Sequence, residues 1–118
     1  MMAPKLAKPR GFSPIVSSVQ ETLNVVGVEL HEFMIKQTTG GAPMRMSRFT
    51  VAPGCATEED RHAVHEIWLV ARGKADVCYD SQWFSTSAGD ALYFSPWKPH
   101  HARNVGEDQL QIFSLWWS

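Results

Sequence analysis

The densest group of ionisable side chains lies in residues 59–66, whose sequence EDRHAVHE holds three carboxylates and two histidines. Imidazole nitrogens and carboxylate oxygens are ordinary ligands of divalent metals, and they are also common acids and bases of enzymes. An apolar run follows at residues 67–71, so the ionisable groups precede a strand that should be buried. Bare carboxylates are costly to bury, and a divalent cation removes that cost. This stretch is therefore the first candidate for a chemical site.

The spacing of these groups predicts which of them share a face. In a strand, alternate side chains point to the same side. Asp60, His62 and Glu66 have the parity of Trp68, whereas His65 has the other. If the first set faces an interior, it enters one pocket with Trp68 in the apolar floor. A bulge would bring His65 inward instead. The alternative is that these groups are solvated loop charges.

A second polar cluster follows in residues 89–104, GDALYFSPWKPHHARN. A Gly-Asp turn again precedes an apolar strand, and a loop with two prolines leads to His100, His101 and Asn104. Two strands that carry histidines can converge in a small barrel. The two clusters together therefore favour a shared site over isolated surface histidines.

The rest of the chain predicts an all-β fold. Short stretches rich in β-branched and aromatic residues alternate with Gly, Pro, Asn, Asp and Ser. No ten-residue stretch combines a clean helical period with helix caps, although residues 19–30 could hold a short helix. This pattern is typical of an antiparallel sandwich or barrel. The expected strands are residues 15–19, 25–37 (as one strand or two), 44–52, 65–72, 75–79, 83–87, 91–95, 101–105 and 110–117.

The first cluster resembles the first motif of the cupin family, which runs Gly, His-x-His, Glu, Gly. Five residues separate Gly54 from Asp60, three separate His62 from Glu66, and six separate Glu66 from Gly73, as in that motif. One departure is that Asp60 stands where the motif has its first histidine. A second is the extra histidine directly before Glu66.

The second cluster resembles the second cupin motif, which runs Gly, Pro-x-Gly, His, Asn. Five residues follow Gly89 before Ser95, two separate Trp97 from His100, and three separate His100 from Asn104. Ser95 and Trp97 replace the Pro and Gly of the motif. The resemblance covers residues 54–104 and implies a cupin double-stranded β-helix, a jelly-roll barrel, in one domain at 15–118. Residues 1–14 hold Pro and basic residues and are predicted to form a flexible arm.

By this resemblance, His62, Glu66 and His100 fall on metal-ligand positions and Asp60 falls on a fourth. Without Asp60, the two histidines and one carboxylate leave open positions, as in non-haem Fe(II) oxygenases and in the cupin epoxidase that makes a phosphonate antibiotic. With Asp60 bound, two carboxylates balance a divalent ion, and Fe²⁺, Zn²⁺ or Mn²⁺ would fit. A third alternative is a metal-free site that uses histidine and tyrosine as acid and base.

The leading expectation is a metal-dependent enzyme that acts on a small polar metabolite, as an oxygenase or as a lyase or isomerase. Small cupins of this kind resemble tailoring enzymes of secondary metabolism, and formation of a nitrogen–nitrogen bond on zinc is one narrow version. The alternatives are a non-catalytic module that binds a sugar or another small molecule, a metal-free acid–base dehydratase or isomerase, and a storage-like barrel. The retained ligand residues argue against the last.

Several other residues are candidates for the pocket. Glu66 and Tyr93 are the catalytic candidates, Tyr93 as a phenolic acid or base. Trp68, Trp97 and Arg61 are candidates for the substrate pocket, where an aromatic ring can stack on a flat substrate and a rim cation can hold a carboxylate.

Composition limits the partners. The formal charge of −1 without basic or acidic blocks disfavours nucleic acid and anionic membranes. No apolar run is long enough to cross a bilayer. Cys55 and Cys78 lie in unlike contexts and are predicted to be free thiols of a cytoplasmic protein. Residues 110–117 are apolar on both faces, which predicts a homodimer with one face in the core and the other against a partner.

Overall fold

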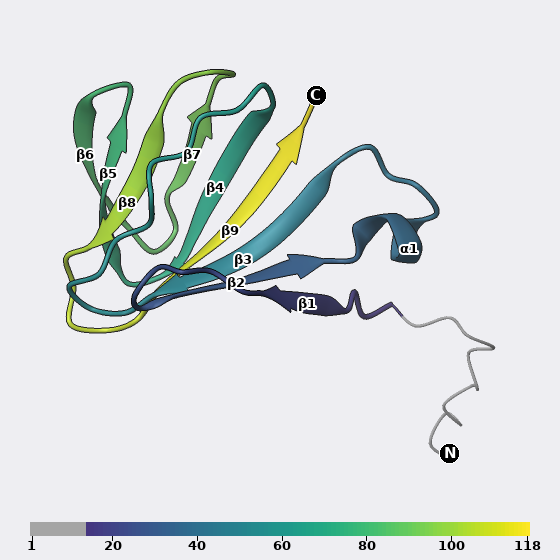
Figure 1. Cartoon of the computed structure of the whole chain (residues 1–118), viewed down its shortest axis with the longest axis horizontal. Helices are drawn as coiled ribbons and strands as arrows, with labels where there is room; N and C mark the ends of the chain where they lie inside the picture. Colours follow the sequence, from purple (N-terminus) through teal and green to yellow (C-terminus); the bar gives the residue numbers. More distant parts are fainter. Residues whose placement is uncertain (1–13) are drawn as a thin grey trace, which may run out of the picture.

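The computed structural model describes residues 14–118, which form nine strands and one short helix in two facing sheets (Figure 1). The larger sheet has the order β1-β2-β3-β9-β4-β7, and the smaller has the order β6-β5-β8. All neighbouring strands within these sheets are antiparallel. The elements are β1 Ser18–Glu21, β2 Val28–Phe33, α1 Ile35–Thr39, β3 Arg45–Val51, β4 His65–Arg72, β5 Lys74–Tyr79, β6 Gln82–Ser87, β7 Ala91–Phe94, β8 His100–Asn104 and β9 Leu110–Trp117.

The core fills the space between the two sheets, and strand alternation explains its composition. In β4, Glu66, Trp68 and Val70 are buried, whereas the residues between them face the other side of the sheet. The same alternation in β3, β5, β8 and β9 supplies the rest of the core. The buried cluster consists of Phe49, Val51, Trp68, Val70, Ala75, Val77, Phe94, Ala102, Leu110 and Ile112.

Two turns show why the chain reverses where it does. Asp80 and Ser81 both have positive φ, 49° and 69°, as a two-residue turn with the twist of a β-hairpin requires between β5 and β6. Gly73 joins β4 to β5 with φ 91°, and a Cβ atom there would lie 3.1 Å from the backbone of Leu110. A side chain at this position would therefore be both strained and crowded.

The all-β jelly-roll prediction is confirmed. The expected strands lie close to the observed ones, with two differences. Residues 19–30 contain no helix but β1, a turn and the start of β2, and the short helix lies instead at Ile35–Thr39, where a strand was expected to continue. The parity argument extended the strand expected at 65–72 back to Asp60, but residues 60–64 form a loop, because β4 begins at His65. The predicted arm, 1–14, lies outside the described residues except for Pro14.

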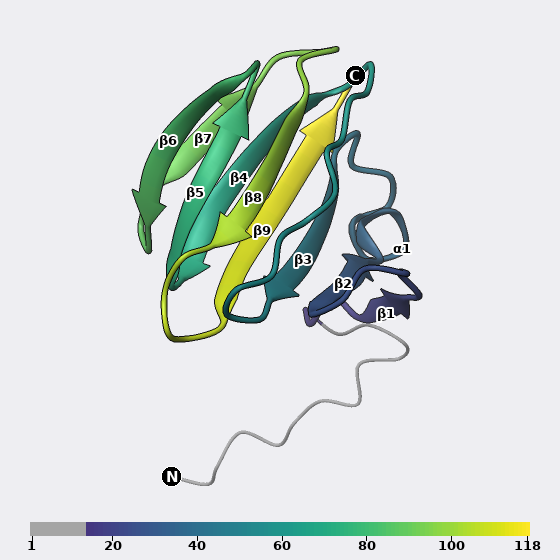
Figure 2. The ribbon, with the colours of Figure 1, turned by 60° about the vertical axis from the view of Figure 1, so that its left-hand side comes forward.

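Figure 2 shows β8 and β5 of the smaller sheet in front of β4 and β9 of the larger one. The site lies between these layers, because the inward side chains of β4, β8 and β9 converge there. Within residues 14–118, no helix has the length and apolar character that crossing a bilayer requires.

Candidate metal centre

Glu66 is the buried centre of the site. It lies on the inward face of β4, and only 7% of its surface is exposed. Its Oε2 accepts hydrogen bonds from the indole Nε1 of Trp68, at 2.9 Å, and from the hydroxyl of Ser114. Both donors come from strands within the same sheet, so they fix the carboxylate rigidly. Its other oxygen, Oε1, is thereby directed at the two motif histidines.

His100 and His62 approach this oxygen from two different elements. His100 begins β8 and is 1% exposed, and His62 lies in the loop before β4. The Nε2 atom of each ring lies 2.8 Å from Oε1 of Glu66. The ring centroids are 5.1 Å apart, edge to face. Three donor atoms from three segments of the chain therefore meet at one point.

Backbone carbonyls determine where the protons lie on the two rings. Nδ1 of His100 donates to the carbonyl of Lys98 at 2.9 Å, and Nδ1 of His62 donates to that of Val64 at 3.2 Å. A carbonyl only accepts, so each Nδ1 carries a proton and each Nε2 of a neutral ring presents a lone pair. Two lone pairs and a carboxylate oxygen repel one another unless protons or a cation lie between them. This donor set therefore fits a divalent cation, and the carbonyl contacts are those that orient metal-binding imidazoles.

The electrostatics of the metal-free cluster follow from the same contacts. Burial would raise the pKa of Glu66, but hydrogen bonds from His100, Ser114 and Trp68 and the charge of His100 outweigh it and lower the pKa to about 2. Burial would lower the pKa of His100, yet the Glu66 carboxylate and the Lys98 carbonyl raise it above 6.5. Without a metal, these shifts favour the pairing of an ionised carboxylate with an imidazolium, in which a proton takes the place of a cation.

Asp60 lies at the edge of this cluster. Its backbone exchanges two hydrogen bonds with His100, at 2.9 and 3.0 Å, as an isolated bridge to β8. Its exposed carboxylate is 3.8 Å from Nε2 of His62, and ligand atoms of Asp60, His62 and His100 all lie within 4.8 Å of one another. The structure thus brings together all four residues that the sequence assigned to a metal, and Asp60 reaches the site from a loop.

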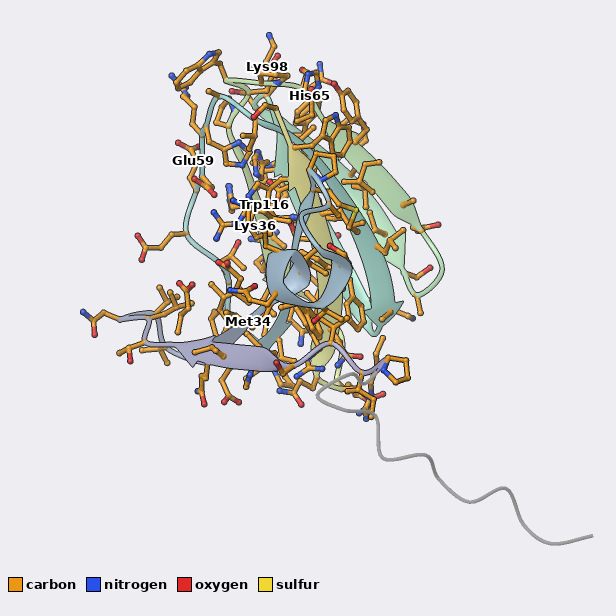
Figure 3. All side chains as sticks on the ribbon, turned by 90° about the vertical axis from the view of Figure 1, so that its right-hand side faces the viewer. Met34, Lys36, Glu59, His65, Lys98 and Trp116 are labelled. Carbon is orange, nitrogen blue, oxygen red and sulfur yellow. The ribbon has the colours of Figure 1, made fainter. Side chains whose placement is uncertain are left out.

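A cavity of about 590 Å³ opens above the cluster. Glu66, Trp68 and Ser114 form its floor, and the loop before β4 and the β1–β2 hairpin form parts of its walls. Figure 3 shows Trp116 near the end of β9 and Glu59 on the loop beside it. The lining residues are Leu23, Val25, Val28, Leu30, Ser47, Phe49, Thr57, Glu58, Glu59, Asp60, His62, Val64, Glu66, Trp68, His100, Ser114 and Trp116.

Other candidate residues lie elsewhere. Tyr93 is on the outer face of β7, half exposed, where its hydroxyl is 2.6 Å from Nδ1 of His65. Arg61 and Trp97 are not among the residues that line the cavity, although Trp68 is. Histidine 65 has the outward parity of a regular strand, and no bulge brings it inward. His101 also faces outward and packs edge-on against Trp83.

Trp97 acts on the site through its backbone. Its N–H donates to the carbonyl of His62 at 2.7 Å, so it joins the loop before β4 to the loop before β8. Its φ is 68°, the left-handed region that a glycine of the cupin motif would adopt without strain. Its ring is 61% exposed. The substitution therefore keeps the backbone shape of the motif at the cost of strain.

Sequence reasoning missed the donor Ser114 and the acidic residues Glu58 and Glu59 of the cavity wall. Ser114 shares the inward parity of Ile112 and Trp116 in the last strand. A hydroxyl between two inward apolar residues is the signal that could have identified it, since buried hydroxyls require partners.

Comparison with known proteins identifies the family of this chain. The cupin domain model matches residues 47–117, which is more than half of the chain. The chain belongs to the cupin family. An uncharacterized protein of Methanocaldococcus jannaschii is 25% identical over 87 residues, which are 73% of this chain and 70% of that protein.

Two solved structures show how widely this cupin fold is shared. A Thermotoga maritima protein described as a predicted oxalate decarboxylase superposes with a TM-score of 0.72 and 18% identity, over 86% of this chain and 92% of that one. KdgF from Halomonas superposes with a TM-score of 0.68 and 17% identity, over 85% and 86% of the two chains. At these identities the likeness concerns the fold alone.

Proposed function

We propose that this cupin is a metal-dependent enzyme that acts on a small polar metabolite, as an oxygenase if it holds iron and as a lyase or isomerase if it holds zinc or manganese. The observation that carries the proposal is the position of Glu66 Oε1, 2.8 Å from Nε2 of both His62 and His100. A divalent ion at this point would supply Lewis acidity or, as iron, chemistry with dioxygen. A narrower form of this proposal is that the enzyme catalyses a tailoring step in secondary metabolism.

Residues around the ligand atoms would orient them toward the ion. Trp68 and Ser114 keep Oε2 of Glu66 occupied, so that Oε1 remains directed at the imidazoles. The carbonyls of Val64 and Lys98 keep the proton of each ring on Nδ1 and leave Nε2 for the ion. The cavity above admits a small molecule to the same atoms, which supports catalysis over a purely structural role.

The arrangement favours a metal over an acid–base pair of histidine and tyrosine. Tyr93 lies on the outer face, and Tyr79 donates to or accepts from Ser95 rather than lining the cavity. No tyrosine is among the cavity-lining residues of the described chain. Both cysteines, Cys55 and Cys78, are free thiols, which supports the proposal of a cytoplasmic enzyme.

Elemental analysis of protein purified without added metal tests the proposal. We expect close to one equivalent of iron, zinc or manganese per chain, removed by a chelator and restored by adding the same ion. Thermal unfolding before and after reloading should show a higher Tm for the loaded form, because the ion binds only folded protein. The proposal would be overturned if the purified protein contains no metal and its Tm does not change on addition of Fe²⁺, Zn²⁺ or Mn²⁺.

A further inference from the structure

The cavity has a one-sided distribution of charge. Four carboxylates line it, those of Glu58, Glu59, Asp60 and Glu66, and among residues 14–118 no lysine or arginine does. A resident divalent ion would balance two of these charges, one from Glu66 and one from Asp60, if both imidazoles are neutral. Two negative charges then remain, on Glu58 and Glu59.

Within residues 14–118, neither remaining carboxylate is neutralised by an ion pair. Both are exposed at the cavity wall. Arg61 directly follows Asp60 but is not among the residues that line the cavity, and two other cations are paired with acids. Arg45 lies over the ring of Trp116 but is paired with Glu32, and Lys98 is paired with Asp80 at 3.3 Å. The side chains that line the cavity therefore keep a net negative charge even when the ion is bound.

The wall supplied by the first hairpin has the opposite character. Leu23, Val25, Val28 and Leu30, around the turn between β1 and β2, present only apolar side chains to the cavity. In Figure 3 this hairpin projects below the loop that carries Glu59, so the two segments approach the opening from different sides. Trp116 adds an aromatic surface beside them. The cavity thus combines an apolar or aromatic wall with an acidic rim.

We infer that the ligand of this cavity is an amphiphilic cation, a small molecule with an apolar or aromatic body and an ammonium-type nitrogen. The apolar body would pack against the hairpin wall and Trp116, and the cationic nitrogen would lie at Glu58 and Glu59. This inference names the substrate class of the proposed enzyme and so rests on that function. A dicarboxylate such as oxalate, in the description of the Thermotoga protein, would meet repulsion at this rim.

Binding of three matched probes tests the inference. Benzyltrimethylammonium is a cation that cannot coordinate a metal, 2-phenylethanol is neutral, and phenylmethanesulfonate is an anion of similar size whose sulfonate coordinates zinc only weakly. Titrations into zinc-loaded protein, followed by calorimetry and by tryptophan fluorescence, to which Trp68 and Trp116 of the cavity contribute, give three dissociation constants. We expect the cation to bind about tenfold more tightly than the anion, with the alcohol between them. Equal or tighter binding of the anion would overturn the inference.

A variant without the charges of Glu58 and Glu59 tests whether these two carboxylates cause the preference for the cation. In the double variant Glu58→Gln/Glu59→Gln, the preference for the cation should fall to within about threefold, with unchanged metal content. Both residues are exposed, so folding should be unaffected. The matched control, Glu107→Gln/Asp108→Asn, makes the same change of charge on an exposed loop outside the cavity and should keep the preference. A preference that persists in the rim variant would also overturn the inference.

Repeating the titrations with metal-free protein distinguishes this inference from the proposed function. Metal content is measured separately, and the rim carboxylates remain when the metal is removed. If the wild-type chain binds no metal but still prefers the cation, the proposed function fails and the cavity's selectivity stands. If it binds metal but prefers the anion, the function stands and the substrate class falls.

Discussion

On the inner face of the larger sheet, Glu66 of β4 holds two imidazoles at 2.8 Å. On its outer face, one residue earlier, His65 holds the hydroxyl of Tyr93 at 2.6 Å. The inner acceptor is buried and receives charged or polar groups from three segments of the chain. The outer pair is partly exposed, and its histidine ring lies parallel to that of Trp117 with centroids 5.5 Å apart.

The difference shows how burial changes the behaviour of ionisable side chains. On the inner face, ionisable groups converge away from water, so their protonation is coupled and a cation stabilises them. On the outer face, a histidine and a tyrosine lie among apolar side chains, those of Ile67, Leu69 and Leu115. We therefore expect chemistry at the inner face and predict that the outer face serves assembly.

The largest effect should come from substituting the metal-binding residues of the inner face. Glu66→Ala or His100→Ala should lower zinc affinity by more than about 100-fold, because each removes a donor atom of the cluster. His65→Ala, the matched outer change, should leave it unaltered. Competition with a chromophoric chelator measures all three. If His65→Ala strips the metal while His62→Ala does not, the assignment of the two faces is wrong.

The outer face should control assembly and not metal binding. Leu115 lies opposite both Ile67 and Met46 on this face, and Leu115→Lys would place a charge at its centre. We expect a homodimer for the natural chain, since an apolar sheet face of this kind is normally covered, and a monomer for the variant. Light scattering at tens of micromolar gives the masses, and metal content should be equal. The control Phe84→Lys, on an exposed position of β6, should remain dimeric; a monomeric natural chain would contradict the prediction.

The inner cluster should also give the metal-free protein an unusual dependence on pH. The lowered pKa of Glu66 contributes stability above its unfolded value of 4.5, and this is lost as the pH falls toward about 2. The raised pKa of His100 contributes stability that is complete below 6.5 and is lost as the pH rises through the folded value. The contribution of this pair to stability should therefore be largest between pH 4.5 and 6.5.

Bound zinc should reverse the alkaline part of this profile. Zinc needs Nε2 of both histidines unprotonated, so its stabilisation increases as the pH rises. The Tm difference between zinc-loaded and metal-free protein should widen from pH 6 to pH 8. Denaturant titrations of both forms at several pH values measure it. A metal-free protein that is more stable at pH 8 than at pH 6 would show that protons do not hold the cluster together.

The two faces also show which parts of the site could be predicted from the sequence and which could not. Parity in residues 65–72 predicted that Glu66 and Trp68 share the inner face, because a buried strand leaves little freedom of register. Asp60 and His62 reach the site differently, from a loop tied to β8 and to Trp97, and such loop geometry depends on contacts distant in sequence. The role of Ser114 was hidden for the same reason, since its partner Glu66 is 48 positions away.

Tyr93 gives the smallest expected effect and the finest test of the comparison. The sequence made it a candidate acid or base, whereas the structure places its hydroxyl on His65, away from the cavity. Tyr93→Phe removes one partly exposed hydrogen bond and should cost about 1 kcal/mol or less of unfolding free energy. Zinc affinity and cation binding should not change, because neither the ion nor the cavity touches the outer face. Urea unfolding and zinc competition on the same sample measure both. A loss of metal or of ligand binding in this variant would mean that the outer histidine–tyrosine pair communicates with the inner cluster through β4.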